Sequence, residues 1–406
     1  MRKLFPTLAF ILLYSSIHAM VPYEFRVPDI PGYVTLAGDF HVHTCFSDGT
    51  VWPTTRVAEA AYDGLDFMAM TDHVDTRHQK MKKKGYFTSK ADQNTSYRIA
   101  KKVSGEYGVT ILHGAEITRG LRLVPAHFNT HFISDALPIL EALESEDAKI
   151  EDPLKREETA VINGLKAART QNAFITFNHP NWHPQQPVKT EWMPLHEKVY
   201  RLGLIDGIEI VNTYADFCPE AFHWAIEKGL AVVSGTDCHA PMFEIIDYQL
   251  GDKRPRTFVF AKENTPESIK EAVFAGRTIV YHDDCFYGTE ANMKPFFNEA
   301  LKVLSVKITP GDIKIKVRNT TSAPVILSKD TGSDMLSVQF RTKINPGEEA
   351  VLDVDPVGGA KTFDFKECDL NYKVLNYFVD TGTPLKLSWH FTIPTMRGLA
   401  ESSDRK

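Results

Sequence analysis

Histidine and acidic residues recur at short intervals over the first 240 residues, and most of them directly follow an apolar run. The groups are Asp39-Phe40-His41-Val42-His43, Ser47-Asp48-Gly49, Thr71-Asp72-His73, Gly114-Ala115-Glu116, His127, Asn178-His179-Pro180 and Thr236-Asp237-Cys238-His239. Imidazole nitrogens and carboxylate oxygens together suit zinc, manganese or iron. The recurrence of such groups after apolar runs therefore indicates a metal centre rather than isolated surface residues.

The spacing within these groups has a physical meaning. In an extended segment, residues two apart point the same way, so His41 and His43 can reach one site while Val42 turns back into the protein. Asp237 and His239 can do likewise, which leaves Cys238 as a packing residue; Cys45 is interpreted in the same way. Because no thiolate is needed, a purely structural zinc site is disfavoured.

The elements that must position these groups alternate between strand and helix from about residue 33 to residue 280. Expected strands are Val34–His41, Asp66–Met70, Val109–His113, His127–Ile133, Phe174–Phe177, Gly207–Val211, Leu230–Val233 and Thr257–Phe260. Expected helices are Thr55–Asp63, Ser96–Tyr107, Glu157–Arg169 and Pro219–Lys228. Short, fully apolar strands are typical of parallel sheets, whose carboxyl ends converge on one face of a barrel. The pattern favours an α/β barrel and leaves a doubly wound sheet open.

After about residue 296 the pattern changes to short strands separated by turn signals, with no long helical pattern. Expected strands are Val303–Ile308, Ile313–Val317, Val325–Leu327, Leu336–Phe340, Ala350–Val354 and Leu385–Phe391. We therefore expect a barrel domain over residues 20–295, a small all-β sandwich-like domain over 296–394 and a flexible tail over 395–406. The β domain could bind glycan, protein or cell envelope, or only cover the barrel.

The N-terminus has the order of features of a secretory signal peptide. Arg2 and Lys3 precede the apolar stretch Leu8–Ile17, and Ile17-His18-Ala19 resembles a cleavage site. We expect a signal peptide over residues 1–19 and a periplasmic or extracellular protein; a buried first strand or helix is the alternative. The stretch is too short to span a membrane comfortably.

Composition sets further limits. The 406 residues carry a formal net charge of −6, which argues against a broad basic surface for nucleic acid. Five cysteines, an odd number without a CxxC pair, indicate no disulfide framework.

Taken in order, the segments DFHVHTCFSDG, MTDH, GAEIT, HFN, NHP and GTDCH resemble the PHP (polymerase and histidinol phosphatase) superfamily over about residues 33 to 282. The resemblance implies a distorted (β/α)7 barrel and metal-dependent hydrolysis of phosphoesters at a site of three divalent transition metal ions (Zn, Mn or Fe). It implies one ion bound by His41, His43, Glu116 and Asp237, a second by Glu116, His127 and His179, and a third by Asp48, His73 and His239. Some members have His where Asp48 stands, and the sequence leaves His131 open as an alternative to His127.

The chemistry expected of such a site is hydrolysis by activated water. Closely spaced metals lower the pKa of a bridging water, and the resulting hydroxide attacks phosphorus in line while the cations neutralise the phosphoryl oxygens. Asp72 could orient or receive a proton, or could instead support a ligating histidine.

Substrate contacts are predicted at Arg119, His183 and Arg277, with Trp182 and Tyr214 lining the mouth. For the two arginines, a surface position or a helix-end cap is an equally good interpretation. The expected substrate is a small phosphomonoester or phosphodiester. Two other functions remain open: amidohydrolase-type metal hydrolysis, and metal-stabilised binding without turnover.

Overall fold

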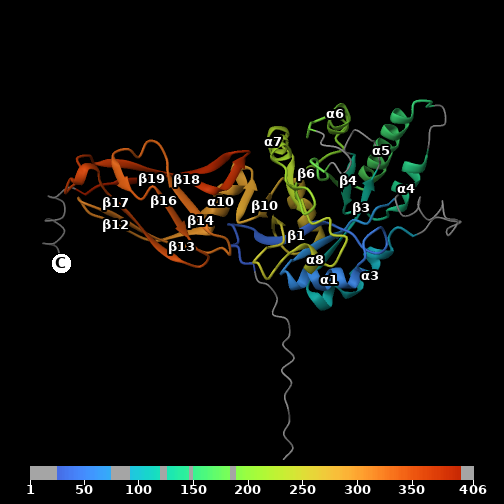
Figure 1. Cartoon of the computed structure of the whole chain (residues 1–406), viewed down its shortest axis with the longest axis horizontal. Coiled ribbons are helices and arrows are strands. Elements are labelled where there is room, and N and C mark those ends of the chain that lie inside the picture. The colour runs from blue at the N-terminus through green and yellow to red at the C-terminus, as the bar shows by residue number, and fades with distance from the viewer. Residues whose placement is uncertain (1–24, 75–91, 119–125, 146–149, 183–188, 395–406) are drawn as a thin grey trace, which may run out of the picture.

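A mixed α/β fold is seen in the computed structural model, which describes residues 25–74, 92–118, 126–145, 150–182 and 189–394. Figure 1 shows helices gathered around strands in the N-terminal part, and a C-terminal part made mainly of strands extending away from it. The sequence prediction of an α/β fold is confirmed at this level.

Seven strands of the large sheet follow one another around the N-terminal part. In their spatial order they are β1 (Val34–Val42), β2 (Phe67–Met70), β3 (Thr110–Thr118), β4 (His127–His131), β5 (Phe174–Phe177), β6 (Gly207–Asn212) and β8 (Ala231–Gly235). The first and last of these meet at their carboxyl ends, where the Asp237 N–H donates to the His41 carbonyl (2.7 Å) and the His43 N–H donates to the Cys238 carbonyl (3.2 Å). The strand ends that carry the histidine and acidic residues therefore face one another around one mouth.

Strand β4 runs opposite to its neighbours. It pairs antiparallel with both β3 and β5, whereas β1, β2 and β3 are parallel to one another, as are β5, β6 and β8. Its register sets Thr118 opposite His127 and Gly114 opposite His131. The amino end of β4 therefore lies beside the carboxyl end of β3, which the strand pattern of the sequence did not predict.

The helices pack outside these strands. They are α1 (Pro53–Tyr62), α3 (Thr95–Tyr107), α4 (Leu137–Glu144), α5 (Pro153–Arg169), α6 (Pro194–Arg201), α7 (Pro219–Lys228), α8 (Met242–Ile245) and α9 (Pro266–Phe274). All four helices expected from the sequence are present, and α7 ends at Gly229, whose φ of 67° is the left-handed cap that glycine favours. Within the described residues, no helix is both long enough and apolar enough to cross a membrane.

Three antiparallel strands extend the sheet from β1 towards the C-terminal part. They are β9 (Arg256–Ala261), β10 (Thr278–His282) and β11 (Cys285–Gly288), and β7 (Asp216–Phe217) is a short strand beside β6. Strand β11 pairs in parallel with β18 (Glu367–Asp380), so one sheet continues from one part into the other. Helix α10 (Glu290–Ala300) crosses the boundary expected between residues 295 and 296.

The described C-terminal residues form two sheets. Besides β18, their strands are β12 (Leu301–Ile308), β13 (Ile313–Asn319), β14 (Val325–Lys329), β15 (Leu336–Val338), β16 (Arg341–Ile344), β17 (Glu349–Pro356) and β19 (Thr383–Thr392). Strands β16, β14, β18 and β19 belong to the large sheet, and β12, β13, β17 and β15 form a separate four-stranded sheet. A short 3-10 helix (Val357–Gly359) follows β17. Alternate residues of β13 are buried, as expected for a strand with one face on a core.

Aromatic side chains fill the junction between the two parts. The Tyr377 ring lies 4.7 Å from Phe286 and 5.0 Å from Phe297, and Phe286 lies 5.1 Å from Phe296 (centroid distances). Tyr377 is fully buried, and its apolar neighbours include residues of both parts. The junction is therefore packed as the interior of a single domain is packed.

We predict that Tyr377→Ala destabilises both parts together. Removing a fully buried ring leaves a cavity and costs about 3–5 kcal/mol of unfolding free energy. Calorimetry should show a lowered, still single unfolding transition, while Tyr377→Phe, which keeps the ring, should remain close to the wild type. Two separate transitions, one of them at the wild-type temperature, would show that the parts are energetically independent.

Candidate metal centre

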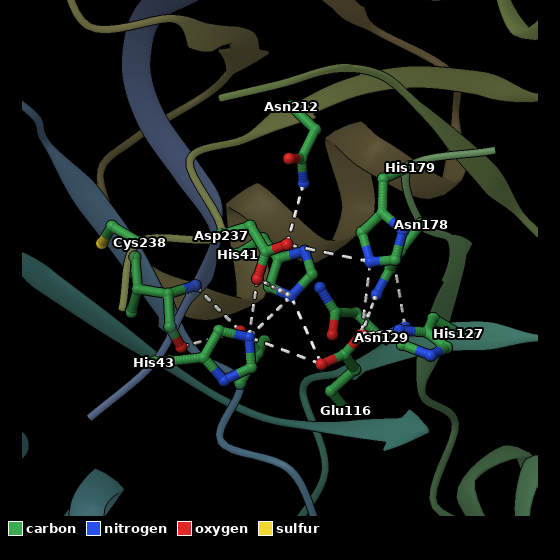
Figure 2. Close-up of polar contacts among 12 residues, drawn as sticks. His41, His43, Glu116, His127, Asn129, Asn178, His179, Asn212, Asp237 and Cys238 are labelled. Atoms are coloured by element: carbon green, nitrogen blue, oxygen red, sulfur yellow. Dashed lines mark hydrogen bonds and ion pairs between the residues drawn. The ribbon is translucent and has the colours of Figure 1, made fainter. Parts of the chain in front are cut away.

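Nine side chains meet at the mouth formed by the strand ends, and we call them the histidine–carboxylate cluster. Its members are His41, His43, Asp48, His73, Glu116, His127, His179, Asp237 and His239. Figure 2 shows six of these side chains pointing toward one another, with Glu116 between His43 and His127; the six are His41, His43, Glu116, His127, His179 and Asp237. All nine are the residues predicted as metal ligands from the sequence.

The Glu116 carboxylate is the centre of the cluster. Its side chain is buried on β3, and its Oε2 lies 2.7 Å from His73 Nδ1, 3.4 Å from His43 Nε2 and 3.6 Å from His41 Nε2. Its Oε1 lies 3.2 Å from His127 Nδ1 and 3.6 Å from His179 Nε2. One carboxylate thus faces two sets of imidazoles, one through each oxygen.

A second carboxylate, Asp237, completes the set around the first two histidines. Its Oδ1 lies 2.9 Å from His43 Nε2 and 3.3 Å from His41 Nε2, and these two nitrogens are 3.0 Å apart. If both of these nitrogens are unprotonated, their lone pairs point at each other and repel. A proton or a cation between them removes this repulsion. The arrangement fits a divalent ion.

Asp48 lies at the outer side of the cluster, close to a third set of histidines. Its Oδ1 lies 3.2 Å from His239 Nε2 and 3.4 Å from His73 Nε2, and it is the most exposed of the carboxylates in the cluster. His43 also belongs to this set, because its Nδ1 lies 3.9 Å from Asp48 Oδ1.

Within the described residues, four groups have ligand atoms that all lie within 4.8 Å of one another. They are His43, Asp48, His73 and His239; His41, His43 and Glu116; His41, His179 and Glu209; and Glu116, His127 and His179. The donors are imidazole and carboxylate throughout, which fits divalent transition metals. The cluster can therefore hold divalent metal ions.

Electrostatics of the buried cluster favours positive charge. Burial alone would lower the pKa of His41, but the carboxylates of Asp237, Glu209 and Glu116 raise it well above its usual value. For Glu116 the two effects have the opposite signs. Burial alone would raise the pKa of this carboxyl, but the positive charges of His73 and His41 hold it well below its usual range. The same fields that hold a proton on His41 would stabilise a metal ion in its place.

Side chains behind the cluster hold the strand ends in place. Buried Arg56 donates to the carbonyls of His43 (2.9 Å) and Cys238 (2.8 Å), and buried Arg254 pairs with Asp39 (2.7 Å). The sequence analysis assigned no role to Arg56 on α1 or to Arg254 before β9, and it listed Asp39 with the first histidines without a role of its own. A charge that supports a backbone carbonyl or a carboxylate far away in the chain has no spacing signal. Cys238 is buried, as expected of a packing residue; none of the five cysteines, all of which lie in the described residues, forms a disulfide.

The antiparallel course of β4 separates His127 from His131. His127, at the start of β4, reaches Glu116, whereas His131, at its end, packs against the rings of Phe40 and Phe174 inside the fold. His131 Nε2 lies 3.3 Å from the Thr176 hydroxyl. Of the two alternatives left open by the sequence, only His127 lies in the cluster.

Asp72 faces the loop that carries Asp48 rather than open space. Its carboxylate accepts hydrogen bonds from the Thr44 N–H (2.8 Å), the Thr44 hydroxyl and the Ser47 hydroxyl (2.6 Å). Ser47 Oγ in turn lies 3.3 Å from His43 Nδ1. These contacts favour a supporting role for Asp72 over proton transfer.

The substrate residues predicted from the sequence fare differently. Arg119 and His183 lie outside the described residues. Arg277 lies away from the cluster: it donates to the Phe260 carbonyl (3.0 Å), which is level with Thr35 at the start of β1, and it pairs with Glu271. Since His41 follows Thr35 by six residues, about 20 Å of strand separates Arg277 from the mouth. Arg277 therefore lies away from the site. Its guanidinium instead links the turn before β10 to β9 and to α9 through Phe260 and Glu271.

Trp182 and Tyr214 do lie beside the cluster. The Trp182 ring is 5.5 Å from that of His127 and 5.3 Å from that of His179, and the Tyr214 ring is 5.8 Å from that of His239. Both aromatic side chains are partly exposed, at 37% and 48% respectively. They border the mouth, as the sequence analysis expected.

A pH dependence of stability follows from His131. Burial, with a smaller contribution from His41, lowers the pKa of His131 from 6.5 to about 3. The unfolded chain therefore takes up a proton below about pH 6.5 that the folded chain does not take up until about pH 3, so stability is lost as the pH falls through this window, at up to about 1.4 kcal/mol per pH unit.

We predict that His131→Gln flattens this dependence in the metal-free protein. Denaturant titrations between pH 6.5 and 4 should give a shallower loss of unfolding free energy than in the wild type. Equal slopes for His131→Gln and the wild type would contradict the assignment.

A buried histidine–carboxylate cluster at the mouth of an α/β fold is an arrangement that suits a metal-dependent hydrolase. No protein-family model matches the chain, and no curated protein matches it either. Among solved structures, the chain is similar to a two-domain protein containing a predicted PHP-like metal-dependent phosphoesterase from Bacteroides vulgatus ATCC 8482. The identity is 32%, the match covers 91% of this chain and 99% of the other, and the TM-score is 0.78.

The chain therefore belongs to the PHP-like metal-dependent phosphoesterases, as its motifs indicated. Two further matches are a proposed metal-dependent phosphoesterase from Bifidobacterium adolescentis (18% identity, 50% of this chain, 87% of the other, TM-score 0.36) and an amidohydrolase from Chromobacterium violaceum with bound sulfate and no metal (17%, 51%, 89%, 0.34). Scores this low do not bear on the fold or on the choice between these activities.

Proposed function

We propose that this protein hydrolyses a phosphomonoester or a small phosphodiester with the help of three divalent transition metal ions (Zn, Mn or Fe). The observation that carries the proposal is the convergence of nine imidazole and carboxylate side chains around Glu116 in a member of the PHP-like phosphoesterases. No thiolate takes part in this donor set, which suits a catalytic centre better than a purely structural one.

The contacts support a division of the cluster into three sites. The first would use His41, His43, Glu116 and Asp237; the second, Glu116, His127 and His179; the third, Asp48, His73 and His239. Glu116 would be shared, since its two oxygens face different histidines. His43 also faces Asp48 and would link the first site to the third.

The charges of the cluster suit an anionic substrate. When bound, divalent ions this close together lower the pKa of a shared water and offset the charge of a phosphoryl group. The carboxylates of Asp48, Glu116 and Asp237 neutralise only half the charge of three such ions, so a loaded site stays cationic and attracts phosphate. Burial of Glu116 and His41 keeps these charges in a low-dielectric setting, where they act more strongly.

We further propose that the seven strands form the distorted (β/α)7 barrel of the PHP superfamily and that residues 296–394 form an all-β accessory domain. Two observations support this division: β1 and β8 meet at their carboxyl ends, and the described residues after 300 form strands with one short 3-10 helix and no α-helix. We also propose export to the periplasm or extracellular space; the signal peptide over residues 1–19 lies outside the described residues, so this proposal rests on the sequence.

We predict that Asp237→Asn and His41→Ala abolish hydrolysis of an aryl phosphate. Asp237→Asn removes the negative charge of a ligand from the first site, and His41→Ala removes an imidazole from it. Several kcal/mol of lost charge stabilisation amounts to a fall of about 10^3-fold in kcat/KM. Metal analysis of the wild-type protein, purified without chelator, should give two to three ions per chain, and each variant should hold less.

Matched controls are available on the C-terminal strands. Asp353→Asn and His390→Ala make the same chemical changes at exposed positions of β17 and β19, and both should retain activity and metal. Parallel assays with a phosphomonoester, a phosphodiester and an amide identify the bond that is cleaved. Amide turnover without ester turnover would support an amidohydrolase, and metal binding with neither would support a binding protein.

We predict that Asp72→Asn weakens the site around Asp48 without changing the shape of the pH–rate profile. The change removes the charge that holds the Thr44 and Ser47 donors, and the loss of such a partner typically costs about 10–100-fold in metal affinity or activity. Chelator titration and rates over a pH series provide the measurement. Disappearance of one limb of the pH profile would instead identify Asp72 as a proton-transfer group.

A further inference from the structure

We propose that Glu209, on β6, is the positioning residue that sets the geometry between two of the metal sites. Its single carboxylate contacts one member of the first site and one member of the second, and it reaches a third cluster residue through Asn212. This inference rests on the proposed metal-dependent function. The sequence analysis did not identify Glu209, since it lies within an apolar strand rather than after one.

The first contact orients His41. Glu209 Oε1 lies 3.1 Å from His41 Nδ1, while His41 Nε2, on the other side of the ring, faces His43, Glu116 and Asp237. A histidine that binds metal through Nε2 carries its proton on Nδ1, and a carboxylate there fixes both the tautomer and the ring plane. Glu209 is placed to hold His41 in the metal-binding form.

The second contact fixes the backbone at His179. Glu209 Oε2 accepts the His179 N–H at 2.8 Å. His179 has a φ of 29°, a left-handed conformation that a non-glycine residue adopts only where its surroundings hold it there. The Glu209 carboxylate supplies one such restraint, and the backbone direction it enforces turns the His179 ring towards Glu116.

The third contact passes through Asn212. The Asn212 amide donates to Glu209 Oε2 (3.1 Å) and to Asp237 Oδ2 (3.3 Å), and Figure 2 shows it reaching towards Asp237. Asp237 also has a left-handed backbone, with a φ of 54°. Both left-handed members of the cluster are thus tied, directly or through one amide, to the same carboxylate.

Glu209 fits in this position because the neighbouring strand β8 has a glycine, and therefore no side chain, beside it. A Cβ at Gly235, on β8, would lie 1.9 Å from Glu209 Oε1 and 2.3 Å from His41 Cβ. Only glycine at this position lets the carboxylate stand against the His41 ring. Glu209 is 2% exposed, so its charge is held away from water and acts strongly on these partners.

Glu209 also belongs to a possible ligand group with His41 and His179, but its contacts favour orientation over ligation. Oε2 already accepts two N–H donors, from His179 and Asn212. Oε1 faces the His41 nitrogen that lies away from Glu116 and Asp237. A ligand would instead direct an oxygen into the space that those two carboxylates share.

The test compares Glu209→Gln with Asp206→Asn in the full chain, using zinc and cobalt as probes. Asp206 also accepts a backbone N–H of a barrel strand and pairs with an arginine, but it contacts no member of the cluster. Chelator competition should show zinc affinity lowered about 10–100-fold in Glu209→Gln and unchanged in Asp206→Asn. At saturating metal, Glu209→Gln should bind as many ions as the wild type, and the cobalt absorption spectrum of its His41 site should shift.

Unchanged affinity and an unchanged cobalt spectrum in Glu209→Gln would overturn the proposal. So would the loss of one whole ion at saturating metal, which would make Glu209 a ligand. If Glu209→Gln does not fold, as judged by thermal unfolding of the metal-free protein, Asn212→Ala tests the same link: a several-fold loss of zinc affinity supports it, and wild-type affinity refutes it. None of these readouts needs turnover, so a wild-type protein that binds metal but cleaves no ester would refute the proposed function without affecting this test.

Discussion

The structure depends on one buried carboxylate, Glu116, which stands among five imidazoles. Burying a carboxylate without a positive partner costs a large desolvation free energy. The imidazole nitrogens around Glu116 lie close to its oxygens and to one another, so their lone pairs repel unless a positive charge lies between them. Positive charge shared among them relieves both costs, because it satisfies the carboxylate oxygens and the imidazole lone pairs together. Bound cations would therefore stabilise the cluster, and the surrounding fold holds its side chains in position.

The fold holds the cluster through charges placed behind it. Arg56 ties the carbonyl of His43 to that of Cys238, which joins the end of β1 to the segment after β8. Asp39, paired with Arg254, accepts from the His41 N–H and from Thr236 and so joins the same two strands one step deeper. Arg56 also pairs with Glu59, and Arg254 also pairs with Asp63, so each buried cation has a carboxylate beside it. Such pairing is the condition under which burial of charge is tolerated. Buried polar contacts therefore hold the strand ends where metals would bind, and partly exposed rings border the mouth.

The C-terminal strands are joined to this scaffold more closely than the change in sequence pattern suggests. The pairing of β11 with β18 continues one sheet across the junction, and Phe286, Phe297 and Tyr377 pack there as a common core. A further contact joins α7 to the end of β18, where His223 pairs with Asp380. The C-terminal part therefore supports the helices and strands that carry the site, whatever else it binds.

The sequence by itself determined most of the helices and strands and the set of side chains that could bind metal. Each expected strand and helix corresponds to an observed one, because apolar runs and helical periodicity report burial directly, and the His and Asp spacings place the nine cluster residues on strand ends. Strands β7, β11, β16 and β18 were not among the expected strands. The first three are only two to four residues long, whereas β18 buries Leu370, Tyr372 and Val374 in alternation, a two-residue period that was overlooked. Only the tertiary structure decided the reversed course of β4, which selects His127 over His131, and the roles of Arg56 and Glu209. These depend on which strands become neighbours, and a residue whose function is to hold another residue has no local pattern of its own.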